Sequence, residues 1–117
     1  MKIKISEATP LQLDYLVATC DGKAGDCEVH SGNIWYGRVT SGFVQYRPST
    51  NWAQGGPIIE REKIRLDTSW NCEDGQWSAR IDGVGGWWQG ETPLIAAMRC
   101  YVASKLGDEI DVPEGLE

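Results

Sequence analysis

The stretch 92–107, "TPLIAAMRCYVASKLG", carries the boundary signals of a helix at both ends and an almost uncharged interior. Thr92 stands directly before Pro93, the order of a capping residue and a first helical residue, and Gly107 stands where a glycine ends a helix. We therefore predict a helix at about residues 93–106. Only two of its residues are charged, so most of its circumference should be buried, either within the chain or against a second copy in a homo-oligomer.

A second helix is predicted near the start of the chain. Thr9 is followed by a proline and, three residues after the threonine, by Gln12, which together form a capping box with proline in the first helical position. The predicted helix covers about residues 10–20, and Gly22 marks its end. Apolar residues recur along it at helical spacing, which turns one face to the core and leaves Gln12 and Asp14 facing water.

Between these helices the apolar residues alternate with a period of two, which is typical of strands. Segments 33–40 and 43–47 flank a Ser-Gly turn signal, and segments 63–70 and 76–82 flank a second turn at 71–75. A short first strand is expected in "KIKIS" at the start of the chain. Together these segments predict an α+β fold with a small, mainly antiparallel sheet and two helices packed on one face of it.

The composition is that of one ordinary globular domain. The chain has 117 residues, of which 41% are hydrophobic and 24% charged, so we expect residues 1–117 to form a single domain. The formal net charge is -6 and the arginines are scattered singly, which argues against duplex nucleic acid as a partner. We find no apolar run that could cross a membrane and no secretory signal, so the sequence favours the cytosol.

The residue types that perform catalysis or bind metal do not form a familiar pattern. Cys20, Cys27, Cys72 and Cys100 are expected to be free thiols in a reducing compartment. The spacing of Cys20, Cys27 and the single histidine, His30, does not match a zinc site. No nucleophile motif or phosphate-binding motif is present. The sequence therefore predicts a protein that is not an enzyme and that needs no metal or other cofactor.

The stretch 51–66, "NWAQGGPIIEREKIRL", is the strongest candidate for a binding loop. Ser49 is a candidate cap for a short turn, the Gly-Gly pair allows backbone angles closed to other residues, and Pro57 is expected to stop any helix. In one interpretation this is a tight corner with Trp52 buried in the core. In the other, uncovered backbone N–H groups hold an anion while Trp52 stacks on a ring.

The binding interpretation defines a set of candidate residues. Arginine supplies a forked donor for an anion and tryptophan a stacking face, which are groups that a nucleotide-like ligand would use. Trp87 and Trp88 cannot both point inwards if their segment is extended, so one of them should face water, a partner or a ligand. The candidate ligand-binding residues are Asn51, Trp52, Gln54, Gly55, Gly56, Arg61, Arg47 and Arg99.

Three stretches together resemble a known family. They are "PSTNWAQGGPIIERE", "TPLIAAMRCYVASKLGDEIDVPEGLE" and an opening of the form "MKIKISE...LDYLVA", which are similar to the NinX-like family of lambdoid phage proteins, a domain of unknown function. The segment 20–40 and the loops around "NCEDGQW" and "GVGGWW" match nothing in that family. The resemblance implies a small phage or prophage accessory protein that acts in the bacterial host cytoplasm, and it implies no cofactor.

Two hypotheses of different kinds follow. In the first, a non-enzymatic binding protein sequesters a small nucleotide-like host molecule, such as an immune signal, in a pocket between the "NWAQGG" corner and the final helix. In the second, an interaction module inhibits or redirects a host protein, with tryptophans as anchors and an acidic surface for steering. The first predicts tryptophans around a closed pocket with arginines. The second predicts them across a flat exposed patch.

Overall fold

The structure is a computed structural model that describes residues 1–38, 42–68 and 75–116. Part of the Ser-Gly turn, Trp70, Cys72 and most of the turn at 71–75 lie outside the described residues. The described elements, in chain order, are β1 (Lys2–Lys4), η1 (Ile5–Glu7), α1 (Pro10–Cys20), η2 (Ala24–Asp26), β2 (Cys27–His30), β3 (Asn33–Arg38), β4 (Gly42–Gln45), α2 (Trp52–Glu62), β5 (Arg65–Asp67), β6 (Trp77–Arg80), β7 (Trp88–Gly90), α3 (Pro93–Leu106) and β8 (Glu109–Asp111).

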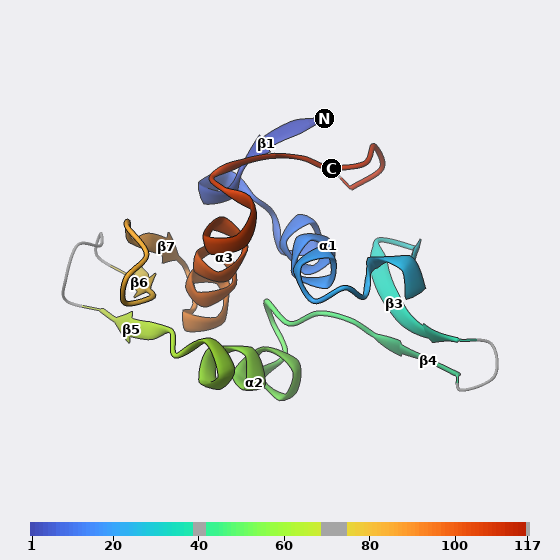
Figure 1. The fold of residues 1–117 in the computed structure, drawn as a ribbon. Helices are drawn as coiled ribbons and strands as arrows, with labels where there is room; N and C mark the ends of the chain where they lie inside the picture. Colours follow the sequence, from blue (N-terminus) through green and yellow to red (C-terminus); the bar gives the residue numbers. More distant parts are fainter. Residues whose placement is uncertain (39–41, 69–74, 117) are drawn as a thin grey trace.

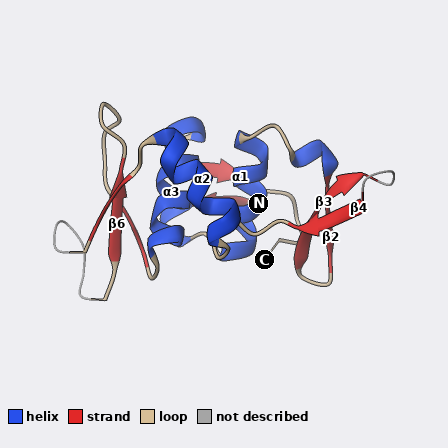
Figure 2. Cartoon of the chain, turned by 90° about the horizontal axis from the view of Figure 1, so that it is seen from below, coloured by secondary structure: helices blue, strands red, loops and turns tan. Residues whose placement is uncertain are grey.

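The described strands form three small antiparallel sheets. Strand β1 pairs with β8, and the other two sheets have the strand orders β2-β3-β4 and β5-β6-β7. Helices lie between the two three-stranded sheets, which occupy opposite ends of the molecule (Figures 1 and 2). The predicted α+β class and antiparallel pairing are confirmed. The arrangement differs from a single sheet with helices on one face. The strands between α1 and α3 pair only with near neighbours in the chain, helices separate the two resulting sheets, and β1 and β8 at the ends of the chain form a third.

The local signals at the ends of the first helix are confirmed. The N–H of Gln12 donates to Thr9 Oγ1 at 3.3 Å, and the N–H of Thr9 donates to Gln12 Oε1 at 3.0 Å, which completes the capping box. Helix α1 ends at its cap residue Asp21, and Gly22 follows with φ at 72°. Because this φ lies in the left-handed region, glycine is the residue best suited to it.

Helix α3 is the central element of the core. Its cap is Thr92, whose Oγ1 accepts the N–H of Ile95 at 3.1 Å. Ala96, Ala97 and Met98 are completely buried, and the helix packs on α1, α2 and the β5-β6-β7 sheet. The prediction that most of its circumference is buried is confirmed, and the burial is within the chain. Small alanine side chains allow neighbouring backbones to approach closely.

The prediction that Pro57 stops a helix is wrong, because α2 runs through it and through the Gly-Gly pair before it. Asn51 caps this helix, with its Oδ1 accepting the N–H of Ala53 at 2.8 Å, so Ser49 is not the cap. Proline removes one intrahelical donor, whose acceptor would be the carbonyl of Ala53. Both Ala53 and Pro57 are exposed, so water can solvate that carbonyl. The loss of one hydrogen bond is therefore tolerated.

Gln12 and Asp14 are buried, contrary to the prediction that they face water. The segment that follows β4 lies against the start of α1 and covers Asp14. There Ser49 is itself fully buried, and its N–H donates to Asp14 Oδ1 at 2.9 Å. The side chain of Gln12 is used in the capping box. A helical pattern of apolar residues cannot reveal such a cover, because the covering segment is distant in the sequence.

Candidate functional site

A cleft of about 350 Å³ lies between α2 and the β2-β3-β4 sheet. One wall is the face of α2, another is formed by β3 and β4, and the end of α1 closes the third side. We call it the tyrosine cleft. It is lined by Asp21, Lys23, Tyr36, Val44, Tyr46, Ala53, Gln54, Pro57, Ile58 and Arg61.

Two tyrosines and a lysine form the aromatic part of this cleft. The ring centroids of Tyr36 and Tyr46 are 6.0 Å apart and the rings are tilted by 51°. The Nζ of Lys23 lies 5.3 Å from the centroid of Tyr36 and 5.4 Å from that of Tyr46. At these distances the ammonium group is attracted to both ring faces. Burial raises the pKa of Tyr46 well above its ordinary value, so its hydroxyl stays protonated at neutral pH and can donate a hydrogen bond.

Arg61 is held in place by a network at the edge of the cleft. Its Nη2 donates to Asp21 Oδ1 at 3.0 Å and to the Tyr101 hydroxyl at 3.1 Å, while its Nε donates to Glu62 Oε2 at 2.8 Å. The Tyr101 hydroxyl also donates to Asp21 Oδ1. The negative charge of Asp21 is therefore balanced by Arg61 and hydrogen-bonded by Tyr101. The ammonium of Lys23 adds a positive charge to the cleft that Asp21 does not neutralise.

The side chain of Gln54 joins α2 to the end of β4. Its Oε1 accepts the N–H of Arg47 at 2.7 Å, and its Nε2 donates to the carbonyl of Gln45 at 2.8 Å. The side-chain amide of Gln54 thus pairs with one backbone N–H and one backbone carbonyl at the end of β4, as the backbone of a neighbouring strand would. This contact fixes the distance between the two main walls of the tyrosine cleft.

Of the predicted ligand-binding residues, Gln54 and Arg61 line the tyrosine cleft, and Arg47 lines a separate cleft. The other predicted residues have structural positions. Asn51 caps α2, and Gly55 is buried beneath Pro48 and Leu94. Gly56 lies beside the Trp52 ring, which is 55% exposed at the first position of α2, and Arg99 donates to the carbonyls of Gln89 and Ala8 at 2.8 and 3.0 Å.

Sequence reasoning missed Lys23, Tyr36 and Tyr46. They come from the loop after α1, from β3 and from the residue after β4. The pairing of β3 with β4 brings the two rings together, and the loop after α1 places Lys23 over them. The alternation of β3 predicts that Tyr36 shares a face with Ile34, but it does not predict what covers that face.

Trp52 is not part of the core, so the interpretation of Trp52 as a buried plug is wrong. Because 55% of its surface is already exposed, we expect Trp52→Ala to change the free energy of unfolding by less than about 1 kcal/mol. Met98→Ala, at a fully buried position, should cost about 2–5 kcal/mol. Urea unfolding followed by circular dichroism measures both, and a loss above about 3 kcal/mol for Trp52→Ala would contradict its exposed position.

The other two tryptophans that the sequence singled out lie at the β5-β6-β7 end. Trp88 is half-buried and packs against the core. Trp87 is also half-buried, and the guanidinium of Arg80 lies 5.0 Å from its ring centroid. Neither lines either of the two clefts described for this chain.

Asp14 is the one buried carboxyl whose pKa is strongly raised among the described residues. Burial raises this pKa from 3.8 to about 6, against the opposing effects of the Ser49 hydrogen bonds and the charge of Arg47. The folded protein therefore binds the proton more tightly than the unfolded chain does. The stability that this group contributes is complete below about pH 4 and is lost as the pH rises through about 6.

Asp14→Asn is accordingly expected to stabilise the protein by about 2 kcal/mol at pH 7, with the gain shrinking towards zero near pH 4. The amide oxygen of asparagine can still accept the N–H of Ser49, so the substitution removes the buried charge and keeps the contact. Asp111→Asn, at an exposed position on β8, is the matched control. Urea unfolding across this pH range is the measurement, and an Asp14→Asn effect that is independent of pH would contradict the assignment.

The chain is thus a small α+β protein. Its central helix, α3, is largely buried by other parts of the same chain, and its tyrosine cleft lies between α2 and the β2-β3-β4 sheet. Within the described ranges, no group of three His, Cys, Asp or Glu side chains could hold a metal ion, and no helix is long and apolar enough to span a bilayer. Cys20, Cys27 and Cys100 are free thiols.

A family model described as Bacteriophage P22, NinX matches residues 4–105, and the chain therefore belongs to the NinX family of bacteriophage proteins. The resemblance seen in the sequence is confirmed. The match runs through the segment 20–40 and the two loops that the resemblance did not reach, whereas the acidic end after residue 105 lies outside it. A comparison with curated proteins finds no match for the chain. The protein is thus a phage accessory protein, and its family assigns it no activity.

Proposed function

We propose that this phage protein is a non-enzymatic binding protein that sequesters a small nucleotide-like host molecule, such as an immune signal, in the host cytoplasm. The site we propose is the tyrosine cleft. It lies between α2 and the β2-β3-β4 sheet, not between the start of α2 and the final helix as the sequence predicted. The observation that carries the proposal is the convergence of Tyr36, Tyr46, Lys23 and Arg61 on one cleft of about 350 Å³, a size within the range of small-molecule sites.

The rings and the lysine suggest how such a ligand would be held. Because the two tyrosine rings are tilted by 51°, a base would stack on one ring and not between the two. The ammonium of Lys23 lies over the faces of both rings. A bound base would take that place, and the ammonium would then pair with the phosphate of the same ligand.

Arg61 supplies the second anchor for the phosphate. Its Nε and Nη2 are engaged by Glu62, Asp21 and Tyr101, which fixes the plane of the guanidinium. Within the described part of the chain, its Nη1 has no protein partner. A donor that is already oriented loses little conformational freedom when it binds an anion, and this favours affinity.

We propose binding without turnover because the groups around the cleft are poor nucleophiles and bases at neutral pH. Burial raises the pKa of the Cys20 thiol, next to Asp21, to about 11, and it also raises the pKa of the Cys27 thiol, which acts on Tyr46 electrostatically, so both stay protonated. The hydroxyls of Tyr46 and Tyr101 also have raised pKa values, first of all through burial. Such groups can position a ligand without attacking it.

Native mass spectrometry of the protein, with and without an extract of infected bacteria, tests this proposal, and calorimetric titration with adenosine monophosphate and other mononucleotides follows. We expect a mass increment of a few hundred daltons. We expect Lys23→Met to lower the affinity about tenfold or more. Lys4→Met, at an exposed position on β1, should have no effect. Absence of any nucleotide-like ligand, or equal binding by the two variants, would overturn the proposal.

A second proposal is an interaction module that binds a host protein, and exposed apolar side chains favour it. Phe43 and Val44 on β4 are 40% and 58% exposed, and Trp52 is exposed at the start of α2. Large exposed apolar residues of this kind serve as interface anchors. In the same mass spectra, a clean apo mass together with a co-purifying host protein, lost in Phe43→Asp but kept in Lys23→Met, would favour this function over ligand capture, because Phe43 does not line the tyrosine cleft.

A further inference from the structure

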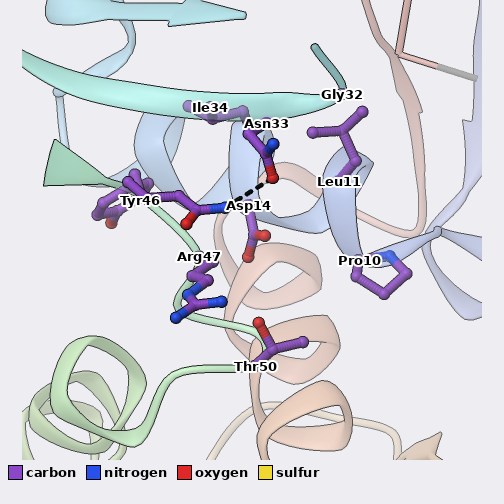
Figure 3. Close-up of a pocket in the computed structure, with 10 residues that line it drawn as sticks. Pro10, Leu11, Asp14, Gly32, Asn33, Ile34, Tyr46, Arg47 and Thr50 are labelled. Atoms are coloured by element: carbon purple, nitrogen blue, oxygen red, sulfur yellow. Dashed lines mark hydrogen bonds between the residues drawn. The ribbon is translucent and has the colours of Figure 1, made fainter. Parts of the chain in front are cut away.

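A second cleft, of about 290 Å³, lies on the other side of Tyr46 from the tyrosine cleft. It is enclosed by the first turns of α1, the start of β3 and the segment that joins β4 to α2 (Figure 3). We call it the Asp14 cleft. Its polar lining comes from Asp14, Asn33, Gln45, Arg47 and Thr50.

The carboxyl of Asp14 is buried but incompletely compensated. Asp14 is only 5% exposed, and the N–H of Ser49 donates to its Oδ1 at 2.9 Å. Ser49 is a neutral residue, and a buried carboxylate that is hydrogen-bonded only to neutral groups is costly. A cationic group that reaches it is bound more strongly than at the surface.

Arg47 lines the same cleft with the opposite charge. Its backbone N–H is used by Gln54, but within the described ranges its guanidinium forms no ion pair and no hydrogen bond. In Figure 3 the carboxyl of Asp14 and the guanidinium of Arg47 both face the hollow beside Thr50. The two charges are close enough for Arg47 to act on Asp14 electrostatically, yet they do not pair. The cleft therefore presents a separate anion and cation.

The neutral groups between these charges are themselves fixed. Gln45 Nε2 donates to Asn33 Oδ1 at 2.6 Å, and Asn33 Nδ2 donates to the carbonyl of Ser31 at 3.2 Å. This leaves the Oε1 of Gln45 as an acceptor at the cleft. Pro10 and Leu11 add apolar surface to the lining. The wall thus combines acceptors on one side, a guanidinium on the other and an apolar patch.

We propose that the Asp14 cleft is a second ligand site, which takes a small aliphatic zwitterion of the free amino acid class. The ammonium group of the ligand pairs with Asp14 and donates a hydrogen bond to Gln45 Oε1. The carboxylate of the ligand pairs with Arg47, whose planar fork suits a bidentate contact. The aliphatic side chain lies on Pro10 and Leu11. A ligand with both charges satisfies both unpaired groups at once, whereas a simple cation or a simple anion leaves one of them unpaired.

Calorimetric titration with three matched probes tests this site. The probes are L-leucine, L-leucinamide, which lacks the carboxylate, and 4-methylpentanoate, which lacks the ammonium. We expect L-leucine to bind about tenfold or more tightly than either analogue. Asp14→Asn, which keeps the acceptor for Ser49, should abolish the preference for L-leucine over 4-methylpentanoate. Arg47→Met, at an exposed position, should abolish the preference for L-leucine over L-leucinamide.

Lys23→Met separates this proposal from the tyrosine cleft, because it should leave the binding of L-leucine unchanged while it weakens the binding of a nucleotide. Circular dichroism confirms that each variant is folded before titration. Three outcomes would overturn the proposal. They are no binding of L-leucine up to about 10 mM, equal binding of the three probes, and an affinity for L-leucine that neither the Asp14 nor the Arg47 substitution changes.

Discussion

Replacing Gly55 by alanine is expected to destabilise the protein by about 3 kcal/mol, although alanine is the better helix former. A Cβ at this position would lie 2.3 Å from the carbonyl oxygen of Pro48 and 2.6 Å from Cδ2 of Leu94. The carbonyl belongs to the backbone of the segment that covers α1, so it cannot move aside as a flexible side chain could. The helix itself would have to shift away from α3.

The adjacent Gly56 is the matched control for this prediction. A Cβ there would find its nearest neighbour, Cε3 of Trp52, at 3.8 Å, which is an ordinary contact distance. Gly56→Ala should therefore leave the stability unchanged or raise it by about 0.5–1 kcal/mol. Urea unfolding of both variants gives the comparison. Equal stabilities would mean that α2 does not pack against Pro48 and Leu94 as described.

The second large effect is expected at Gly90, the last residue of β7. A Cβ here would lie 2.5 Å from the backbone nitrogen of Ala96 and 2.9 Å from Cγ2 of Ile95. Both atoms belong to the start of α3, the most deeply buried helix, so the strand would have to move off the core. We expect Gly90→Ala to cost about 3 kcal/mol and to lower the melting temperature by about 10 °C or more.

Gly85→Ala serves as the control for Gly90, because nothing lies within 4 Å of the Cβ position there and its φ lies outside the positive range. This substitution should be neutral or slightly stabilising, since alanine restricts the unfolded chain more than glycine does. Differential scanning calorimetry of the two variants decides the matter. Similar melting temperatures would show that β7 and α3 are farther apart than the structure places them.

Helices α1 and α3 could be predicted from the sequence because the signals at their ends are local. Thr9 and Thr92 each precede a proline, and each threonine accepts the backbone N–H three residues on. These hydrogen bonds depend only on neighbouring residues, so they can be inferred without the fold. The hairpins of β3 with β4 and of β5 with β6 were predictable for the same reason. How the hairpins are distributed over separate sheets depends on the helices between them.

Helix α2 was not predicted because its residues have low intrinsic helix propensity, and only its tertiary contacts stabilise the helix. Two glycines and a proline disfavour a helix, but Gly55 is what allows α2 to approach Pro48 and Leu94, and Ile58 is buried on the same side. Tertiary packing outweighs propensities of about 1 kcal/mol for each glycine. The candidate site was only partly predictable, since Gln54 and Arg61 lie on that helix while Lys23 and the tyrosines come from distant segments.

The position of Tyr46 gives the two clefts a common element, because this buried side chain lines both of them. The β2-β3-β4 sheet lies at one end of the molecule (Figure 2), and Gln54 ties its last strand to α2. Local opening of this end would dismantle both clefts together. Occupancy of either cleft should therefore suppress the same opening fluctuation and slow amide hydrogen exchange in β3 and β4. By thermodynamic linkage, each occupant would then raise the affinity for the other.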